Sequence, residues 1–131
     1  MNAGRADPGA RCFCTSETHP TPSGPIILLR VAGEVDAFTA PVLRDALTQD
    51  LDQQPAHLVV DVAALTFCSA RGIALLIEAG RAAVDNGTGY ALSGSSRHLA
   101  RMWALLWDDP LPDRYPSAAA AVTTLRHIGP G

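Results

Sequence analysis

Three side chains that could carry chemistry stand together at the start of a predicted helix: Cys68, Ser69 and Arg71. A serine oxygen commonly caps a helix by accepting a hydrogen bond from its free N–H groups, so we expect Ser69 to be a cap. The helix dipole would lower the pKa of the Cys68 thiol and make it redox-active; the alternative is a small, buried core residue. A cation in the first turn opposes the dipole, so Arg71 either extends into water or contacts an acidic partner.

Asp36 and two tryptophans are further candidates for contacts with other molecules. Asp36 ends the segment Gly33-Glu34-Val35-Asp36, where an aspartate readily accepts hydrogen bonds from nearby backbone N–H groups. Trp103 and Trp107 are four residues apart in a predicted helix. We expect one of them in the core and the other exposed as an anchor for a partner.

Motifs for catalysis, cofactors and metals are absent from the sequence. There is no GxxxxGK[ST] loop, no lysine to place in one, and no GxSxG turn. The three cysteines (Cys12, Cys14 and Cys68) form no CxxC pair, and the four histidines share no ligand spacing. We therefore predict a protein that is not an enzyme, has no catalytic residues and binds no metal or cofactor.

Length and composition indicate one soluble globular domain. The chain has 131 residues, 47% hydrophobic and 18% charged, with a formal net charge of −3. A negative net charge does not favour nucleic-acid binding. No apolar run approaches the roughly 20 residues of a spanning helix, and the start of the chain has no signal-peptide core. The expected location is the cytoplasm, without membrane insertion.

Apolar patterning predicts strands that alternate with helices, as in a layered α/β domain. The expected strands are Ile26–Ala32, His57–Val62 and Tyr90–Ser93, and the unbroken apolar run of the second predicts an interior position. A short edge strand is expected at Arg11–Thr15, within an N-terminal tail rich in Pro and Gly. Four helices are expected. The first is capped by Thr39 and reaches Leu51, and the second is Ala70–Asn86. The third is capped by Ser95 or Ser96 and has Leu99, Trp103 and Leu106 on one stripe, and the last runs from Pro116-Ser117 to Arg126. Residues 33–36 and the segment through Phe67 are expected to be loops.

The order of these elements resembles the STAS domain of bacterial anti-sigma factor antagonists. The resemblance runs from about Ile26 to Leu125 and rests on the Gly33–Asp36 segment, the strand-loop-helix segment Asp61–Leu76 and Tyr115-Pro116-Ser117 before the last helix. It implies a STAS-like layered domain over residues 26–126, with a central mixed sheet of four to five strands and about four helices. Residues 1–25 and 127–131 would be tails.

The resemblance also implies a function in transcription control by partner switching. In this family the antagonist binds an anti-sigma factor, often a serine kinase, and so releases a sigma factor. The kinase phosphorylates a hydroxyl at the start of the second helix, and a phosphatase reverses the reaction. Free N–H groups and the dipole tolerate a phosphate at a helix N-terminus, so such a modification changes the docking surface without unfolding the domain.

This sequence departs from the family motif at the phosphorylation site. The usual motif reads Asp-Ser-Ser/Thr-Gly, with the second hydroxyl as acceptor, and this chain has Ser69-Ala70-Arg71-Gly72. Arg71 occupies the acceptor position and cannot be phosphorylated by a serine kinase. Ser69, at the position of the family's Asp, is the remaining candidate phospho-acceptor, and capping alone is the alternative.

The expected docking site consists of Asp36, Ser69, Arg71 and Gly72, which follow strand ends where α/β folds collect functional residues. The expected partners are an anti-sigma factor or serine kinase, and a phosphatase. A second function is compatible with a free-standing domain of this kind: a small STAS subunit that docks on the ATPase of a membrane transport complex.

Overall fold

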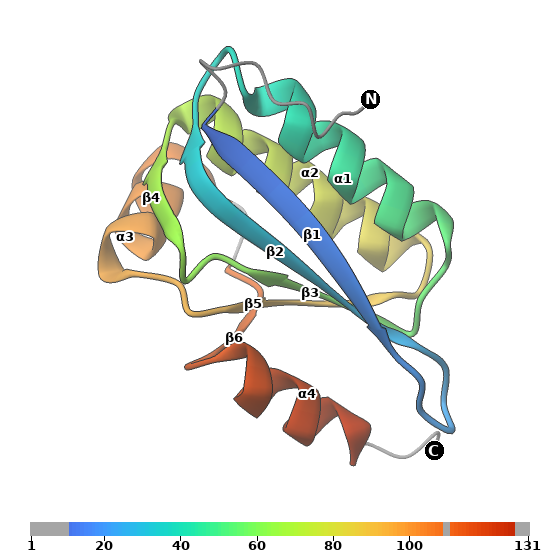
Figure 1. Cartoon of the computed structure of the whole chain (residues 1–131). Coiled ribbons are helices and arrows are strands. Elements are labelled where there is room, and N and C mark those ends of the chain that lie inside the picture. Colours follow the sequence, from blue (N-terminus) through green and yellow to red (C-terminus); the bar gives the residue numbers. More distant parts are fainter. Residues whose placement is uncertain (1–10, 109–110, 128–131) are drawn as a thin grey trace.

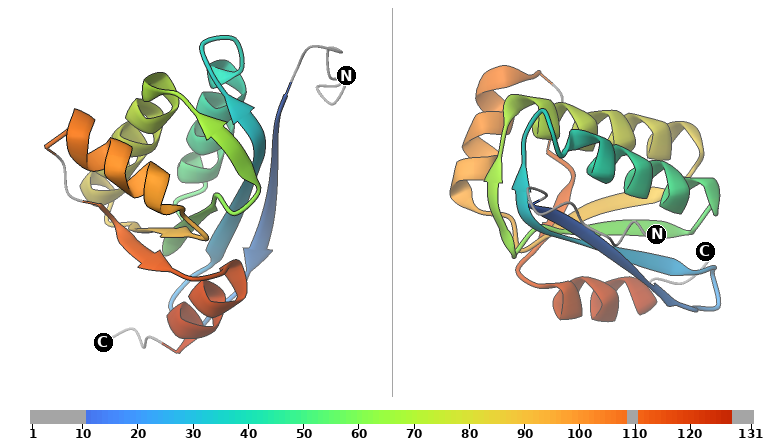
Figure 2. Two further views of the ribbon diagram at one scale, coloured as in Figure 1. Left: turned by 90° about the vertical axis from the view of Figure 1, so that its left-hand side faces the viewer. Right: turned by 45° about the horizontal axis from the view of Figure 1, so that its top comes forward.

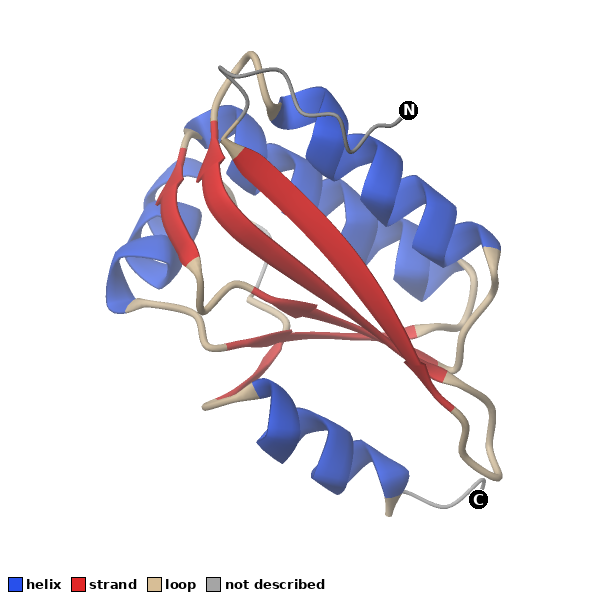
Figure 3. Cartoon of the chain, viewed as in Figure 1, coloured by secondary structure: helices blue, strands red, loops and turns tan. Residues whose placement is uncertain are grey.

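The computed structural model describes residues 11–108 and 111–127 and contains six strands and four helices (Figure 1). In chain order these are β1 (Cys12–His19), β2 (Ile26–Val35), α1 (Ala40–Asp52), β3 (His57–Asp61), β4 (Leu65–Cys68), α2 (Ala70–Asp85), β5 (Gly89–Ser93), α3 (Arg97–Leu106), β6 (Asp113–Tyr115) and α4 (Ala118–Arg126). After β2, helices and strands alternate as the apolar patterning predicts, except that the short strand β4 follows β3 without a helix between them (Figure 3).

The strands form one mixed sheet in the order β1-β2-β3-β5-β6. β1 pairs with β2 antiparallel along its whole length, and the other pairings are parallel. β2 is long enough to pair with two strands on its other side, with β3 through its first half and with β4 near its end. The carboxyl ends of β2 and β4 therefore lie next to each other, which places the segments that follow them side by side.

The two faces of the sheet are covered to different extents. Helices α1, α2 and α3 lie over one face, and α4 alone lies over the other (Figure 2). Alternate side chains of β2 serve both faces: Leu29 and Val31 belong to the larger core, and Ile26 and Leu28 to a smaller core with α4. Burial on both sides explains the unbroken apolar runs at residues 26–29 of β2 and 58–60 of β3.

The predicted layered α/β class is confirmed, and so is the interior position of β3 between β2 and β5. The sheet has six strands, however, where four or five were expected. Two short strands account for the excess: β4 was expected as a loop, and β6 has only three residues. Strands this short carry little pattern of their own and are fixed by pairing with distant neighbours.

Three local expectations also need correction. The edge strand β1 extends to His19, well beyond the expected Thr15. The segment expected as a loop after Ala32 belongs to β2 as far as Val35, with a register shift beside Gly33. Gly33 has φ +94°, and a Cβ there would overlap the Arg11 carbonyl group, so the irregularity requires glycine. In α3, Leu106 is 48% exposed and does not share the buried stripe.

Candidate functional site

The segments expected to form the docking site meet at the carboxyl ends of β2 and β4. Val35 pairs with Cys68 in the parallel ladder, and the Ser69 N–H donates to the Val35 carbonyl oxygen at 2.8 Å. The turn at residues 36–39 and the start of α2 are therefore neighbours at the top of the view in Figure 1. We call this region the α2 start edge, defined by residues 36–39 and 69–72.

Ser69 caps α2, as its position predicts. Its backbone is extended, with φ −75° and ψ 171°, and its Oγ accepts a hydrogen bond from the Gly72 N–H at 3.3 Å. The Ser69 carbonyl then accepts the first α-helical bond, from Ile73. The hydroxyl oxygen is thus part of the helix start while the side chain remains half-buried.

Gly72 is a packing residue and does not belong to the docking surface. It is buried, and a Cβ at this position would lie 2.6 Å from the Cys68 sulfur and 2.7 Å from a methyl carbon of Val35. The start of α2 therefore approaches the sheet more closely than any larger residue would permit. The expectation that Gly72 contacts a partner is wrong because other parts of this chain cover it.

Cys68 lies in the core beneath the helix start, where its thiol is protonated at neutral pH. Burial raises the pKa of the Cys68 thiol to about 11, with a smaller contribution from the nearby Cys12. Its sulfur donates a weak hydrogen bond to the Ser69 carbonyl at 3.7 Å. Desolvation outweighs the helix dipole here, so the alternative of a small buried core residue describes Cys68.

Arg71 projects from the first turn of α2 and is exposed. None of the ion pairs among the described residues involves its guanidinium, and the first turn of α2 contains no acidic side chain. A cation at this end of a helix is disfavoured by the dipole. Arg71 therefore gives the isolated domain no visible stabilisation, and its charge is available to another molecule.

Asp36 uses its carboxylate to hold the turn before α1. One carboxylate oxygen accepts from the N–H groups of Phe38 at 2.9 Å and Thr39 at 3.0 Å, and at 3.2 Å it shares the Thr39 hydroxyl proton with the Glu34 carbonyl oxygen. These hydrogen bonds, first among them that from the Thr39 N–H, lower the pKa of Asp36. The carboxylate thus binds local backbone, which was the structural alternative for this residue.

Thr39 occupies the N-cap position of α1, but its hydroxyl does not cap the helix. The hydroxyl donates to the Glu34 carbonyl oxygen at 2.9 Å and accepts from the Asp36 N–H at 2.9 Å. Pro41, which has no N–H, stands at the beginning of the helix and reduces the number of donors that need a cap. Thr39 therefore fastens the turn to β2, contrary to the expected capping role.

Of the three exposed phenylalanines, two lie close to the α2 start edge and were not singled out in the sequence. Phe38, in the turn held by Asp36, is 94% exposed, and Phe67, near the end of β4, is 52% exposed. An aromatic residue directly before a helix is a visible signal, but such a residue often packs against the helix instead. Only the tertiary structure separates these outcomes.

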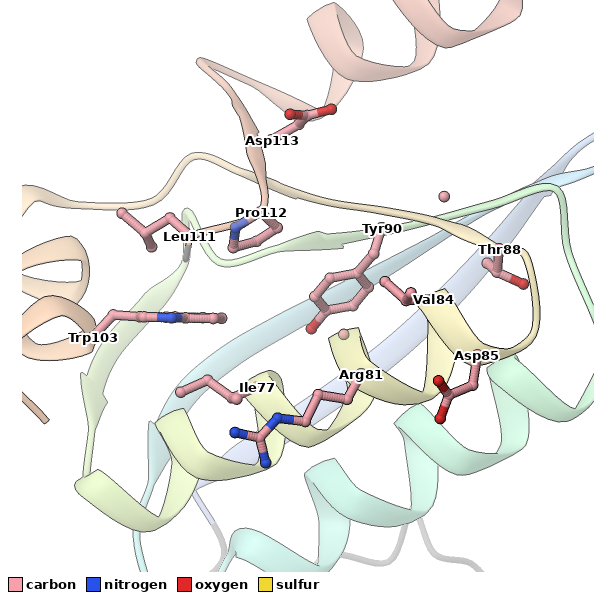
Figure 4. Close-up of a pocket in the computed structure, with 12 residues that line it drawn as sticks. Ile77, Arg81, Val84, Asp85, Thr88, Tyr90, Trp103, Leu111, Pro112 and Asp113 are labelled. Carbon is pink, nitrogen blue, oxygen red and sulfur yellow. The ribbon is translucent and has the colours of Figure 1, made fainter. Parts of the chain in front are cut away.

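A cavity lies at the other end of α2. It has a volume of about 540 Å³ and lies between α2, β5, α3 and the segment before β6 (Figure 4). The ring of Tyr90 forms part of its wall, and the Tyr90 hydroxyl donates to the Leu76 carbonyl oxygen at 2.8 Å. None of the predicted docking residues lines this cavity.

Only one of the two expectations for the tryptophans agrees with the structure. Trp103 is buried in the core beside this cavity, as expected for one of the pair. Trp107 is half-buried and packs against the same core, so it is not the exposed anchor that the spacing suggested.

Two further features are absent from the described ranges, 11–108 and 111–127. No helix within them is long and apolar enough to cross a membrane. Nor do three His, Cys, Asp or Glu side chains of these ranges come together in a way that could hold a metal ion.

Comparisons with known proteins agree with the architecture. A family model described as "Mlab, STAS domain" matches residues 23–107. The crystal structure of an anti-sigma factor antagonist from Mycobacterium paratuberculosis is similar, with 25% sequence identity and a TM-score of 0.67 over 87% of this chain and 95% of that one. The antagonist SpoIIAA of Bacillus, in its unphosphorylated form, has a TM-score of 0.68 at 15% identity, over 87% of this chain and 100% of its own.

A transport protein shares the same fold. The murine anion transporter Solute Carrier 26 family member A9 matches 79% of this chain with 18% of its own, at 12% identity and a TM-score of 0.64. At this identity, the likeness concerns the fold alone. The family model covers more than half of the sequence, and the chain accordingly belongs to the STAS-domain family.

Proposed function

We propose that this protein is an anti-sigma factor antagonist, which binds an anti-sigma factor of the serine-kinase type and so releases a sigma factor for transcription. The fold it shares with the mycobacterial antagonist supports this proposal. The observation that carries it is the exposed guanidinium of Arg71, without an ion pair among the described residues, at the α2 start edge. A charge placed against the helix dipole is explained by a contact with an acidic partner.

We further propose that control of binding differs from the usual switch. Arg71 stands at the usual acceptor position, so docking there is constitutive unless Ser69 takes the phosphate. The Ser69 hydroxyl lies at the N-terminus of α2, where a phosphate would be tolerated by the N–H groups that it now caps. A phosphatase would then be needed only if Ser69 is modified.

The proposal is tested by binding and phosphorylation in one experiment. The purified chain is titrated with a serine-kinase-type anti-sigma factor from the same cell by calorimetry, and then incubated with that kinase and ATP. We expect specific binding, no modification of residue 71, and any phosphate on Ser69 in fragment mass spectra. Stoichiometric phosphate on a distant hydroxyl such as Ser95 would contradict the site assignment.

The same fold also occurs within an anion transporter, and we therefore name a second candidate function. In that case the chain would be a small STAS subunit that docks on the ATPase of a membrane transport complex. A parallel titration with such an ATPase separates the two functions. Binding to the ATPase alone would favour the transport role and remove the need for a phosphorylatable hydroxyl.

A further inference from the structure

Phe38 is the most exposed large apolar side chain of the described residues, at 94%, followed by Val84 and Leu105 at 75%. A residue in its position, directly before the N-cap, can pack on the fourth residue of the helix and so fix the start of the helix. That residue is Leu43, which is 1% exposed and is covered by the core without Phe38. The aromatic ring therefore makes no such contact and remains in solvent.

The backbone that carries Phe38 is held in place by several hydrogen bonds. The Phe38 N–H donates to the Asp36 carboxylate, and the next residue, Thr39, is bound to Asp36 and to Glu34 of β2. The Ala40 N–H also donates to the Asp36 carbonyl oxygen at 2.8 Å. A group that is already ordered before binding loses little conformational entropy when a complex forms.

Phe38 and Arg71 lie on the same α2 start edge and share one property. Each is exposed in a way that does not stabilise the isolated domain: an apolar ring in water, and a cation at the positive end of a helix. Aromatic and arginine side chains are also the groups that most often dominate the energy of protein interfaces. A partner surface that complements both must offer an apolar pocket bordered by carboxylates.

We propose that Phe38 is the apolar anchor of the docking surface and that Asp36 is its positioning residue. This inference rests on the proposed function and specifies its partner: a protein surface with an apolar pocket for the Phe38 ring and acidic side chains for Arg71. Asp36 acts through the turn and makes no charged contact with the partner.

The anchor is tested by titration calorimetry with the serine-kinase-type anti-sigma factor. Because the ring is exposed, Phe38→Ala leaves the melting temperature unchanged and weakens binding by about 30-fold or more, as expected for an interface hot spot. Val84→Ala is the matched control, since Val84 is 75% exposed at the far end of α2, and its affinity stays within about twofold. Equal affinities for Phe38→Ala and wild type overturn the proposal.

Two substitutions at Asp36 test the positioning role. Asp36→Asn keeps an oxygen that accepts the Phe38 and Thr39 N–H groups, so most of the affinity is retained. Asp36→Ala removes it, and we expect faster amide hydrogen exchange at these two residues together with about tenfold weaker binding. If Asp36→Asn binds as weakly as Asp36→Ala, the carboxylate contacts the partner by its charge and the positioning role is wrong.

The same titrations distinguish failure of the anchor from failure of the function. If Arg71→Glu loses affinity while Phe38→Ala does not, the anchor is refuted and the antagonist function stands. If the wild-type chain does not bind the anti-sigma factor at all, the function is refuted and the anchor with it.

Discussion

The two ends of helix α2 present surfaces of opposite character. At its start, the helix lies so close to the sheet that only glycine fits at residue 72, and charged and aromatic groups project outward from this tight base. Near its other end, the packing leaves a cavity of about 540 Å³ beside Tyr90 and Trp103 (Figure 4). The helix is continuous, so the difference arises from what packs against each end.

The start of α2 thus carries exposed side chains on a tightly packed base, whereas its other end borders a cavity. A cavity of this size is typical of sites for small molecules, whereas exposed anchors on a rigid base are typical of protein interfaces. Arg71, which the sequence predicts as a docking residue, is an exposed side chain of this kind, and the turn held by Asp36 presents the exposed Phe38 ring. The comparison therefore supports protein recognition at the α2 start edge.

The largest expected effect tests the tight packing at the start of α2. Gly72→Ala places a methyl group against Cys68 and Val35, and we expect a loss of about 1–3 kcal/mol in the free energy of unfolding. Gly80→Ala is the matched substitution at the cavity end, where the new methyl lies 3.1 Å from the Tyr90 ring. There the gain in helix propensity, about 1 kcal/mol, offsets the free-energy cost of a small shift of the ring, so the free energy of unfolding changes little. Urea unfolding of both variants measures the difference, and equal losses would mean that the two ends are packed alike.

A smaller effect concerns the charge at the α2 start edge. Arg71→Glu replaces a cation with an anion that the dipole favours, so the melting temperature should not fall. Affinity for the anti-sigma factor should fall tenfold or more, about 1.4 kcal/mol, if Arg71 meets an acidic surface. Arg126→Glu in α4, below the opposite face of the sheet, is the control for affinity. If the Arg71→Glu variant binds with wild-type affinity, Arg71 is a solvated side chain that does not contact the partner.

The cap of α2 gives an effect of about 1 kcal/mol. Ser69→Ala removes the oxygen that accepts the Gly72 N–H, and a loss of this size in unfolding free energy is typical of serine caps. Ser117→Ala removes the equivalent bond at the start of α4, where Ser117 accepts from Ala120 at 3.1 Å. Similar losses for both variants in thermal unfolding would show that Ser69 contributes to stability only as a cap. A Ser69→Ala variant as stable as wild type would contradict the capping role.

The smallest effect is the pH dependence of the turn before α1. The pKa of Asp36 is lowered in the folded state from its ordinary value of 3.8, so its stabilisation is present above that value and lost as the pH falls through the folded-state pKa. The melting-temperature advantage of wild type over Asp36→Asn should therefore grow as the pH rises. Asp50 is the contrast, because burial raises its pKa, and its advantage over Asp50→Asn should shrink as the pH rises. If the melting-temperature advantage changes with pH in the same direction at both positions, the hydrogen bonds of the Phe38 and Thr39 N–H groups to Asp36 are contradicted.

Signals confined to a few neighbouring residues predicted their structures well. Ser69 caps α2, Ser96 caps α3 through the Leu99 N–H at 3.1 Å, and Gly87 adopts φ +72° directly after the Asn86 C-cap. Capping depends on hydrogen bonds within one turn, and a glycine stop on one backbone angle. Such features can be inferred without knowing what lies on the other side of the sheet.

The sequence was sufficient to predict that the candidate docking residues lie at one edge of the sheet, but it did not predict which of their side chains are available. Ser69, Arg71 and Asp36 do meet at one edge, because the strands that precede them are parallel neighbours. Which side chains remain available there was not predictable: the Asp36 carboxylate is used by its own turn, Gly72 is buried, and Phe38 is exposed.

Local patterns were sufficient to predict the layered α/β class, the interior position of β3 and the cap of α2, because hydrophobic periodicity and capping involve neighbouring residues. The pairing of the short strands β4 and β6, the close approach at Gly72 and the exposure of Phe38 became visible only in the folded chain. Each of these depends on a contact, made or missing, with residues distant in the chain. A contact of that kind leaves no mark in the few residues around it.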